Sequence, residues 1–273
     1  MDWLGLTLPY MALGCCAGFI AGLFGVGGGL IIVPALVFLF QHQHVAASGL
    51  MHLALGTSLA SIVVTSLASI HAHQRQANIR WDYFRLLTPG IIIGVLCGSW
   101  VADRVDGDTL RTGFSLFVIL VAVQIGLELR PVAQHRLAGK GELGLAGTLI
   151  GLISALVGIG GGTLTTPYLL WNAVSIRQAI GTSAACGLPI AVFGSIGYVI
   201  AGLDAGQLPD GSSGYIYWPA WLGIISTSML FAPLGARLTG ILPDRTLKRV
   251  FALLLVLVAT RMLFFDTGVT TGV

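Results

Sequence analysis

The chain has 273 residues, of which 55% are hydrophobic and only 9% are Asp, Glu, Lys or Arg. Because soluble domains contain about 25% charged residues, this composition excludes a soluble globular protein and indicates one that crosses a membrane several times. The formal net charge of +3 comes from basic residues in the joints between apolar blocks, not from a basic patch, so the sequence predicts no nucleic-acid partner.

Eight apolar blocks follow one another along the chain, separated by short polar joints. A helix needs about 20 apolar residues to cross a bilayer, so blocks of this length nearly exhaust the sequence and leave no room for a soluble domain. No basic segment precedes the first block, and we expect no cleaved signal peptide. The blocks are residues 8–40, 46–70, 84–102, 110–128, 143–172, 178–203, 216–240 and 247–265.

The first block, residues 8–40, is too long for a single span. As one helix its 33 residues would measure about 50 Å, whereas the hydrocarbon core is about 30 Å thick. Three consecutive glycines, Gly27 to Gly29, weaken helix in its middle. We therefore expect two half-membrane helices folded as a re-entrant hairpin with the glycines at its tip. Non-helical backbone at that depth is tolerated only inside protein or against a water-filled cavity.

The second block carries the motif Gly56-Thr57-Ser58. Thr57 lies about 17 Å along this helix, near the bilayer centre. We expect the hydroxyls of Thr57 and Ser58 to face a cavity and to donate hydrogen bonds to a bound anion. The alternative is that each bonds its own i−4 carbonyl, as hydroxyls in membrane helices commonly do. His52 on the same helix is a candidate proton relay, and its alternative role is a hydrogen bond to a neighbouring carbonyl.

The second half of the chain repeats these features. Residues 21–36 read AGLFGVGGGLIIVPAL and residues 154–169 read SALVGIGGGTLTTPYL, with an offset of 133 between equivalent glycines. The motif at residues 54–58 recurs at residues 179–183 as Ala-Ile-Gly-Thr-Ser. A glycine-interrupted apolar helix in corresponding places of two halves is the best sequence pointer to a transporter's binding site.

The sequence thus predicts an all-α polytopic membrane protein of two inverted repeats, each a glycine-broken re-entrant helical hairpin followed by three transmembrane helices. A polar connector, residues 129–142, joins them. The first repeat, residues 1–128, has the hairpin 8–40 and helices 46–70, 84–102 and 110–128, and the second, residues 143–273, has the hairpin 143–172 and helices 178–203, 216–240 and 247–265.

The basic residues of the joints predict an orientation. If both hairpins are re-entrant, every arginine and lysine in the joints except Arg104 and Arg111 falls on one side of the membrane. Such an excess marks the cytoplasmic side. We therefore expect the connector 129–142 in the cytoplasm, both termini outside, and the two halves inverted relative to each other.

Each predicted hairpin tip offers a place for an anion. The helix that starts after the glycines has unpaired N–H groups and roughly half a positive charge at its beginning. Glycine lets an anion approach these groups without a Cβ in the way. The alternative is that the glycines only permit close helix crossing. The candidate substrate-binding residues are Gly25, Gly27, Gly28, Gly29, Thr57, Ser58, Gly158, Gly160, Gly161, Gly162, Thr163, Thr182 and Ser183.

Signals of other chemistry are missing from the sequence. No apolar block contains a central Asp or Glu, and no G-x-x-x-x-G-K-[ST] nucleotide motif occurs. The four cysteines lack the spacing of a metal site or a disulfide framework, and the histidine pairs at 42/44 and 71/73 point their rings to different helix faces. We expect no enzyme activity, no cofactor and no bound metal.

At these motifs the chain resembles the sulfite exporter TauE/SafE family of membrane transporters. The resemblance covers nearly the whole chain and rests on the duplicated G-x-G-G-G-x-x-x-x-P and on the A-[LI]-G-T-S that follows each copy. It implies export of sulfite, or of an organosulfonate such as sulfoacetate, across a bacterial inner membrane. The expected partners are a small anionic substrate and the lipid bilayer, with H+ or Na+ as a candidate coupling ion.

Three mechanisms remain open from the residues. The leading one is a transporter that gives alternating access to an anion held at the midplane between the two hairpin tips. An anion channel would use the same helix dipoles, and an intramembrane enzyme would need a nucleophile–base pair or metal cluster that the sequence does not show. Because the cell interior is negative, export of a monovalent anion gains about 2.3 kcal/mol per 100 mV, so export needs no coupling ion.

Overall fold

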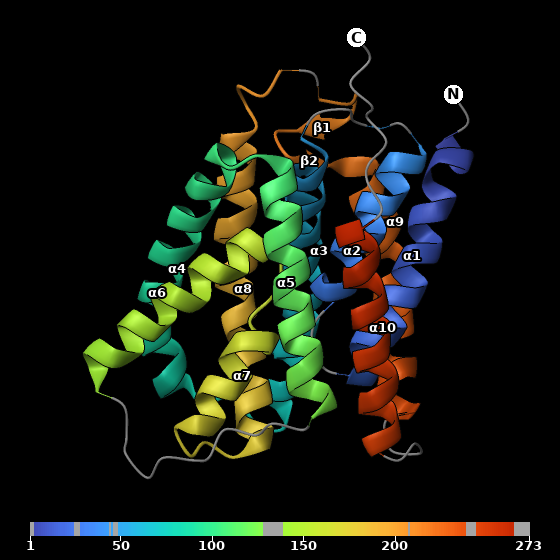
Figure 1. The fold of residues 1–273 in the computed structure, drawn as a ribbon. Coiled ribbons are helices and arrows are strands. Elements are labelled where there is room, and N and C mark those ends of the chain that lie inside the picture. The colour runs from blue at the N-terminus through green and yellow to red at the C-terminus, as the bar shows by residue number, and fades with distance from the viewer. Residues whose placement is uncertain are drawn as a thin grey trace.

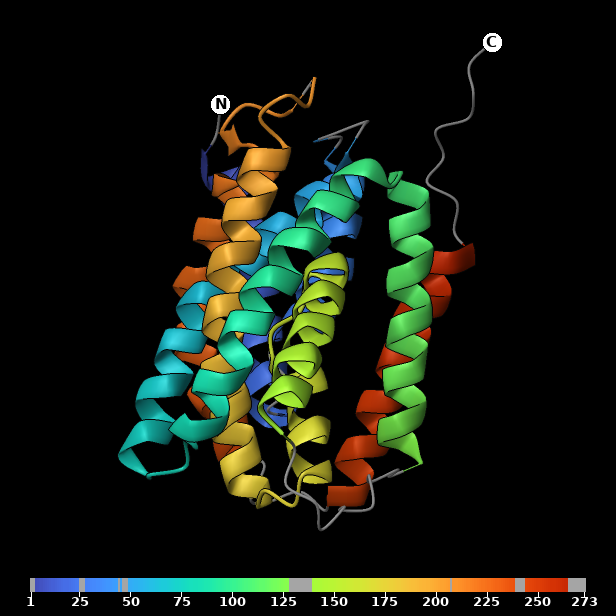
Figure 2. The same ribbon diagram turned by 90° about the vertical axis from the view of Figure 1, so that its left-hand side faces the viewer.

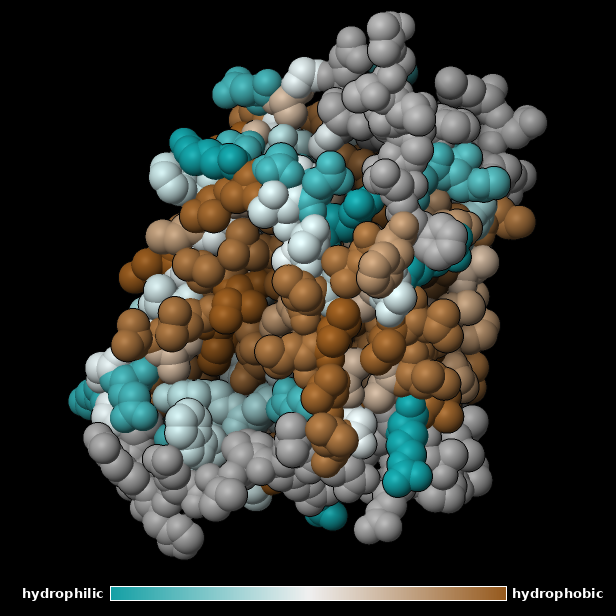
Figure 3. All heavy atoms as spheres, in the orientation of Figure 1, coloured by the Kyte–Doolittle hydropathy of each residue, from teal (hydrophilic) through white to brown (hydrophobic). Residues whose placement is uncertain are grey.

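The computed structural model describes residues 3–24, 28–43, 45, 49–127, 139–206, 208–238 and 244–264. Within these ranges the chain is almost entirely helical, as Figures 1 and 2 show. Five of the described helices are long and apolar enough to cross a membrane by length and composition. Hydrophobic side chains cover the middle of one face and hydrophilic ones gather above and below it (Figure 3). This arrangement confirms a polytopic α-helical membrane protein.

The two glycine-rich blocks are each divided into two helices. The first gives α1 (Trp3–Phe24) and α2 (Gly29–His42), and the second gives α6 (Lys140–Val157) and α7 (Gly162–Trp171). In Figure 1, α1 starts and α2 ends at the upper end of the molecule, whereas α6 starts and α7 ends at the lower end. Each interruption falls at the glycine cluster, where helix is weakest.

The backbone at Gly158 explains why α6 stops. This residue has a φ of +66°, in the left-handed region that glycine enters at little cost. The N–H of Ile159 donates to the carbonyl of Ser154 at 3.1 Å, the long-range bond of a Schellman helix end. The α6–α7 turn (residues 158–161) therefore begins with a conventional C-terminal cap, although its surroundings are apolar.

The remaining helices build the bundle around these two pairs. In Figure 2, α5 and α10 stand together on one side, and the other helices form the bulk of the molecule. These helices are α3 (Leu50–Arg75), α4 (Trp81–Arg104), α5 (Gly107–Gly126), α8 (Ile176–Ala201), α9 (Trp218–Leu238) and α10 (Asp244–Phe264).

A short antiparallel ladder corrects the all-α expectation. Strand β1 (Ser212–Ser213) pairs with β2 (Ile216–Tyr217), and α9 begins at Trp218 instead of at residue 216. Gly214, between the strands, has positive φ, which permits the tight reversal there, and Gly211, directly before β1, has positive φ as well. Periodicity alone could not separate these two apolar residues from the helix that follows them.

Glycines set the closest helix contacts. Helix α1 packs along α9, and α6 packs along α4. A methyl on Gly94 of α4 would overlap the carbonyl oxygen of Thr148 on α6, and one on Gly18 of α1 would lie 2.5 Å from the carbonyl oxygen of Ser228 on α9. Small residues spaced four apart allow membrane helices to approach this closely. The central pair of the bundle, α3 and α8, lies between these two contacts.

We expect Gly94→Ala to lower the unfolding temperature of the purified protein in detergent, because the added methyl overlaps the backbone of α6. Overpacking of this kind costs about 1–3 kcal/mol. Gly113→Ala on α5 is the matched control, since no heavy atom lies within 4 Å of its added methyl. Equal unfolding temperatures of the two variants would contradict a close α4–α6 contact.

Candidate functional site

The start of α2 touches the α6–α7 turn. A methyl on Gly29 would lie 2.7 Å from the Gly158 carbonyl oxygen and 2.9 Å from the Ile159 Cα. Only glycine leaves room for these two backbones to meet. The structure therefore brings together Gly29 and Gly158, which the sequence places in equivalent clusters of the two halves. The candidates Gly25 and Gly27 lie outside the described residues.

The α6–α7 turn lies between the central helices α3 and α8. A methyl on Gly160 would lie 3.2 Å from the Ile62 Cγ2 of α3, and one on Gly161 would lie 2.6 Å from the Ser183 carbonyl oxygen of α8. Close backbone packing thus accounts for Gly161 without a ligand. At Gly28 an added methyl would meet only the Cδ1 of Ile32, at 2.7 Å, which is the end of a flexible side chain.

Ser58 holds the α6–α7 turn in place. Its buried hydroxyl donates to the Gly158 carbonyl oxygen at 2.9 Å, across a sequence separation of 100 residues. A hydroxyl has one proton to donate, so in this conformation that proton serves the turn. An anion at this point would have to replace the carbonyl as acceptor. The sequence indicated the depth of Ser58 but not this partner.

Ser183, the equivalent of Ser58, has different partners. Its hydroxyl donates to the Ile180 carbonyl of its own helix at 2.9 Å and accepts from the Thr166 hydroxyl at 2.8 Å. The bond to its own helix runs to the i−3 carbonyl, a variant of the i−4 bond that was the alternative for membrane hydroxyls, while Thr166 ties α7 to α8. The two serines are therefore not chemically equivalent, despite identical motifs around them.

The two threonines of the motif play one role in both halves. Thr57 accepts a hydrogen bond from the backbone N–H of Tyr217 at 3.0 Å, and Thr182 accepts one from the backbone N–H of Arg80 at 2.9 Å. Tyr217 directly precedes α9 and Arg80 directly precedes α4. Helix starts carry N–H groups without intrahelical partners, and each threonine supplies an acceptor there.

The glycine that precedes each threonine leaves room for this contact. A methyl on Gly56 would overlap the Tyr215 carbonyl oxygen, and one on Gly181 would overlap the Asn78 carbonyl oxygen. Each Gly-Thr pair therefore fastens the chain segment that enters a helix of the other half. Sequence reasoning missed this role. A signal was present in the sequence, because an offset of 137 residues aligns Trp81 with Trp218, and the residues before them, Arg80 and Tyr217, are the ones that donate to the two threonines.

Buried hydroxyls without partners surround the α6–α7 turn. Among the described residues, Ser154 and Thr165 are fully buried and Thr163 is only 8% exposed. The hydroxyl oxygens of all three have no hydrogen-bond partner. Native proteins seldom leave buried polar atoms unpaired, so such a group marks a place for water or a ligand. The equivalent of Thr163 is Leu30, so only the second cluster carries these hydroxyls.

Backbone donors lie beside these hydroxyls. Helix α7 starts at Gly162, and its first intrahelical bond in this turn runs from the Thr165 N–H to the Gly161 carbonyl at 2.9 Å. The N–H groups before it have no acceptor within the helix, and the helix macrodipole adds partial positive charge at this end. Backbone donors and two side-chain hydroxyls without partners thus lie in the first turn of α7, the hydroxyls of Thr163 and Thr165 on different faces of the helix.

His52 holds a helix end instead of pointing at this turn. Its Nε2 lies 2.9 Å from the Ala102 carbonyl oxygen and 3.1 Å from that of Val105, where α4 ends. The ring stacks on Tyr215 with centroids 4.9 Å apart. The carbonyl-bonded alternative therefore describes His52 in this structure, and the Nε2 proton satisfies carbonyls that the end of α4 leaves unpaired.

Comparison with known proteins decides the family. The family model named sulfite exporter TauE/SafE matches residues 10–262. The chain belongs to this family. A relative from Haemophilus influenzae, named "Probable membrane transporter protein", is 41% identical over 255 residues, which is 92% of this chain and 96% of the relative. No solved structure matches.

More distant members of the family also align over most of their length. The protein of Bacillus subtilis named "Probable membrane transporter protein YunE" is 23% identical over 274 residues, covering 93% of this chain and 96% of YunE. A relative from Methanocaldococcus jannaschii is 29% identical over 234 residues, covering 84% of this chain and 83% of the relative. All three relatives are named as membrane transporters, so this TauE/SafE chain is a multi-pass membrane transporter.

We expect Thr57→Val and Thr182→Val each to destabilise the protein, because each leaves a buried backbone N–H without its acceptor. Such a loss costs about 1–3 kcal/mol, and thermal unfolding in detergent measures it. Thr112→Val on α5 is the control, since its exposed hydroxyl only bonds the i−4 carbonyl of Asp108. If the Thr57 and Thr182 variants unfold at the temperature of the Thr112 variant, the two threonines do not fasten the helix starts.

Proposed function

We propose that this transporter exports a small sulfur-containing oxyanion, sulfite or an organosulfonate, from a site at the α6–α7 turn. The observation that carries the proposal is the group of unpartnered donors there, the buried hydroxyls of Thr163 and Thr165 beside the N-terminus of α7. The family name supports sulfite as the substrate class. The names of the relatives support transport without specifying a substrate.

The chemistry of the site complements an oxyanion. Oxyanions offer only acceptors, whereas this turn offers backbone N–H and side-chain O–H donors. Hydrogen bonds that involve a charged partner are about twice as strong as neutral ones, and the start of α7 adds partial positive charge. The site therefore binds an anion without a lysine or arginine, whose strong charge would slow release.

The arrangement of helices supports inverted repeats. Helix α1 of the first half packs on α9 of the second, and α6 of the second half packs on α4 of the first. Because α1 corresponds to α6 and α9 corresponds to α4, the two contacts are equivalent under the repeat. The pair α1–α2 opens toward one end of the molecule and α6–α7 toward the other (Figure 1). We infer that both pairs are re-entrant hairpins and that their tips approach the midplane from opposite faces. Their first helices, α1 and α6, have 22 and 18 residues and are longer than the half-membrane helices expected, and α6 is one of the five helices long enough to cross a membrane.

In this proposal, alternating access requires a change in the hydrogen bonds that hold the α6–α7 pair to its neighbours. The bond from Ser58 to Gly158 and the bond from Thr166 to Ser183 hold the α6–α7 turn to α3 and α8. Both have short, rotatable donors that can turn to an anion. An arriving anion that accepts from Ser58 would release the Gly158 carbonyl and loosen the turn from α3. Binding and movement of the turn are thereby coupled at one side chain.

We expect Thr163→Val and Thr165→Val to weaken anion binding, because each removes one donor at nearly constant volume. A hydrogen bond to a charged group is worth about 1.5–3 kcal/mol, so the dissociation constant for sulfite or sulfoacetate should rise roughly 10- to 150-fold. Equilibrium binding to the purified variants and flux from loaded proteoliposomes are the measurements.

Two controls make this test specific. Thr163→Ser keeps the hydroxyl and should restore binding, and Thr88→Val on α4 removes a hydroxyl that bonds only the Phe84 carbonyl. Unchanged affinity in both valine variants would remove these hydroxyls from the site. Saturable, trans-stimulated flux supports a carrier, whereas ohmic single-channel currents would replace it with an anion channel.

The inverted arrangement predicts the accessible side of each joint. Gln76 is exposed between α3 and α4, and the basic residues of this joint place it in the cytoplasm. In a variant without the four native cysteines, Gln76→Cys should react with a membrane-impermeant maleimide only after the cells are opened. Asp106→Cys, at the other end of α4, should react in intact cells. Labelling of residue 76 from outside would overturn the inverted model.

A further inference from the structure

Helix α3 follows the α6–α7 turn with residues spaced four apart. Ser58 bonds the Gly158 carbonyl, and Ile62 lies beside Gly160, where an added methyl would be 3.2 Å from the Ile62 Cγ2. Residues four apart share one face of a helix, so Ser66 is the next residue on the same face. The face of α3 that holds the turn thus continues to a third side chain, which is again a serine.

The hydroxyl of Ser66 makes no hydrogen bond with the described residues, although the residue is only 7% exposed. Neighbouring hydroxyls on the same helix are paired. Ser61 donates to the Thr57 carbonyl at 2.9 Å and Thr65 donates to the Ile62 carbonyl at 3.2 Å, which is the usual state of hydroxyls in membrane helices. A buried polar group that lacks such a bond marks a place for water or a ligand.

The Ser66 hydroxyl lies at an open space beside Gly187 of α8. A methyl on Gly187 would lie 3.0 Å from the Ser66 Oγ and 3.4 Å from the Gly161 nitrogen. No further heavy atom of a described residue outside α8 lies within 4 Å of that methyl position. Among the described residues, the Gly161 N–H has no hydrogen-bond acceptor. Two donors from different elements, a hydroxyl and an amide, therefore border one small space.

The repeat does not provide these groups a second time. The offset of 125 that aligns the two Gly-Thr-Ser motifs pairs Gly187 with Ile62 and Ser66 with Ala191. The equivalent positions thus carry a branched side chain and a methyl in place of the open space and the hydroxyl. The same bias toward the second glycine cluster appears in the hydroxyls of α7.

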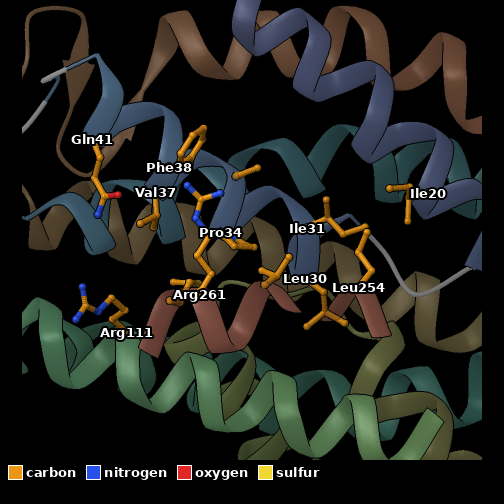
Figure 4. Close-up of a pocket in the computed structure, with 13 residues that line it drawn as sticks. Ile20, Leu30, Ile31, Pro34, Val37, Phe38, Gln41, Arg111, Leu254 and Arg261 are labelled. Carbon is orange, nitrogen blue, oxygen red and sulfur yellow. The ribbon is translucent and has the colours of Figure 1, made fainter. Parts of the chain in front are cut away.

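The space at Gly187 is not part of the cavity that Figure 4 shows. That cavity, of about 450 Å³, lies between α2, α5 and α10. Its lining includes Leu30, Pro34 and Leu254 but neither Ser66 nor Gly187, and no residue of the α6–α7 turn. The donors beside Gly187 therefore belong to the turn and to the two central helices.

We propose that Ser66 is a further anion-binding residue, whose hydroxyl binds the transported oxyanion together with the Gly161 N–H in the space beside Gly187. The inference rests on the proposed function and extends its site from the first turn of α7 to α3. An oxyanion accepts from both groups, and its negative charge strengthens each bond. Because Gly187 has no side chain, it leaves the room that the oxygens need. The bound anion then joins α3 to the turn at a second point beyond Ser58.

Substitution of the serine separates binding from packing. Ser66→Ala should raise the dissociation constant for sulfite about 10- to 150-fold, because it removes one hydrogen bond to a charged group. Its unfolding temperature without the anion should not fall, because the hydroxyl has no partner to lose. Equilibrium binding and thermal unfolding of the purified protein in detergent measure the two effects.

Ser61→Ala is the matched control on the same helix. It removes a buried hydroxyl that bonds only the Thr57 carbonyl, so the affinity for sulfite should stay at the wild-type value. If Ser66→Ala lowers the unfolding temperature without the anion and leaves the affinity unchanged, Ser66 has a packing role and the proposal is wrong.

Filling the open space tests the same site from α8. Gly187→Ala places a methyl against both donors and should weaken sulfite binding about tenfold or more. Gly194→Ala on the same helix is its control, because the added methyl meets side-chain carbons of Leu59 and Val95 at the same distances, 3.0 and 3.4 Å. The two variants therefore have similar packing, and only the Gly187 variant should lose affinity.

The results distinguish this inference from the proposed function. If Thr163→Val weakens sulfite binding while Ser66→Ala and Gly187→Ala bind as the wild type does, the inference is wrong and the site at α7 remains. If the wild-type protein binds neither sulfite nor sulfoacetate, the proposed function fails and the inference fails with it. An equal loss of affinity in the Gly187 and Gly194 variants would show a packing effect and overturn the role of the open space.

Discussion

The interrupted backbone at residues 158–161 is the constraint to which the surrounding helices adapt. Peptide groups outside a regular helix must find partners when the surroundings are apolar, because no water replaces them. Ser58 of α3 donates a hydrogen bond to the Gly158 carbonyl, and the Ile159 N–H bonds the Ser154 carbonyl in the Schellman helix end. Gly29 lets the start of α2 pack against the same turn. The donors that remain without partners lie where α7 begins. The same interruption that the fold must stabilise thus leaves a small polar area inside an apolar bundle, and that area is the anion site that we propose.

Glycines and threonines stabilise this bundle in different ways. Glycines such as Gly94 and Gly18 remove side chains where two helices cross, so that backbone meets backbone. Threonines such as Thr57 and Thr182 then supply a directional bond at points where a helix starts. Membrane helices gain little from hydrophobic association with each other, so close packing and a few specific hydrogen bonds decide how they are arranged.

Much of the fold could be predicted from the sequence because it depends on local properties. Apolar length located the helices, and the glycine clusters located the two interruptions. The partners of Thr57 and Thr182 could not be predicted, since they lie 160 and 102 residues away and repeat equivalence gives no distance. For the same reason, the sequence could not predict that the Ser58 hydroxyl, expected to bind an anion, donates to the Gly158 carbonyl 100 residues away. The strands between residues 212 and 217 are too short for a periodic pattern to reveal them.

The threonine contacts also cross the boundary between the halves, and this determines what can move as one body. Thr57 joins α3 of the first half to the entry of α9 in the second, and α9 in turn packs along α1. Thr182 joins α8 of the second half to the entry of α4 in the first, and α4 packs along α6. Each resulting three-helix body takes members from both halves, and the two bodies meet where α3 packs against α8. The repeats that we propose and the bodies joined by these contacts therefore differ, and two halves synthesised as separate chains would have to interlock before either body was complete.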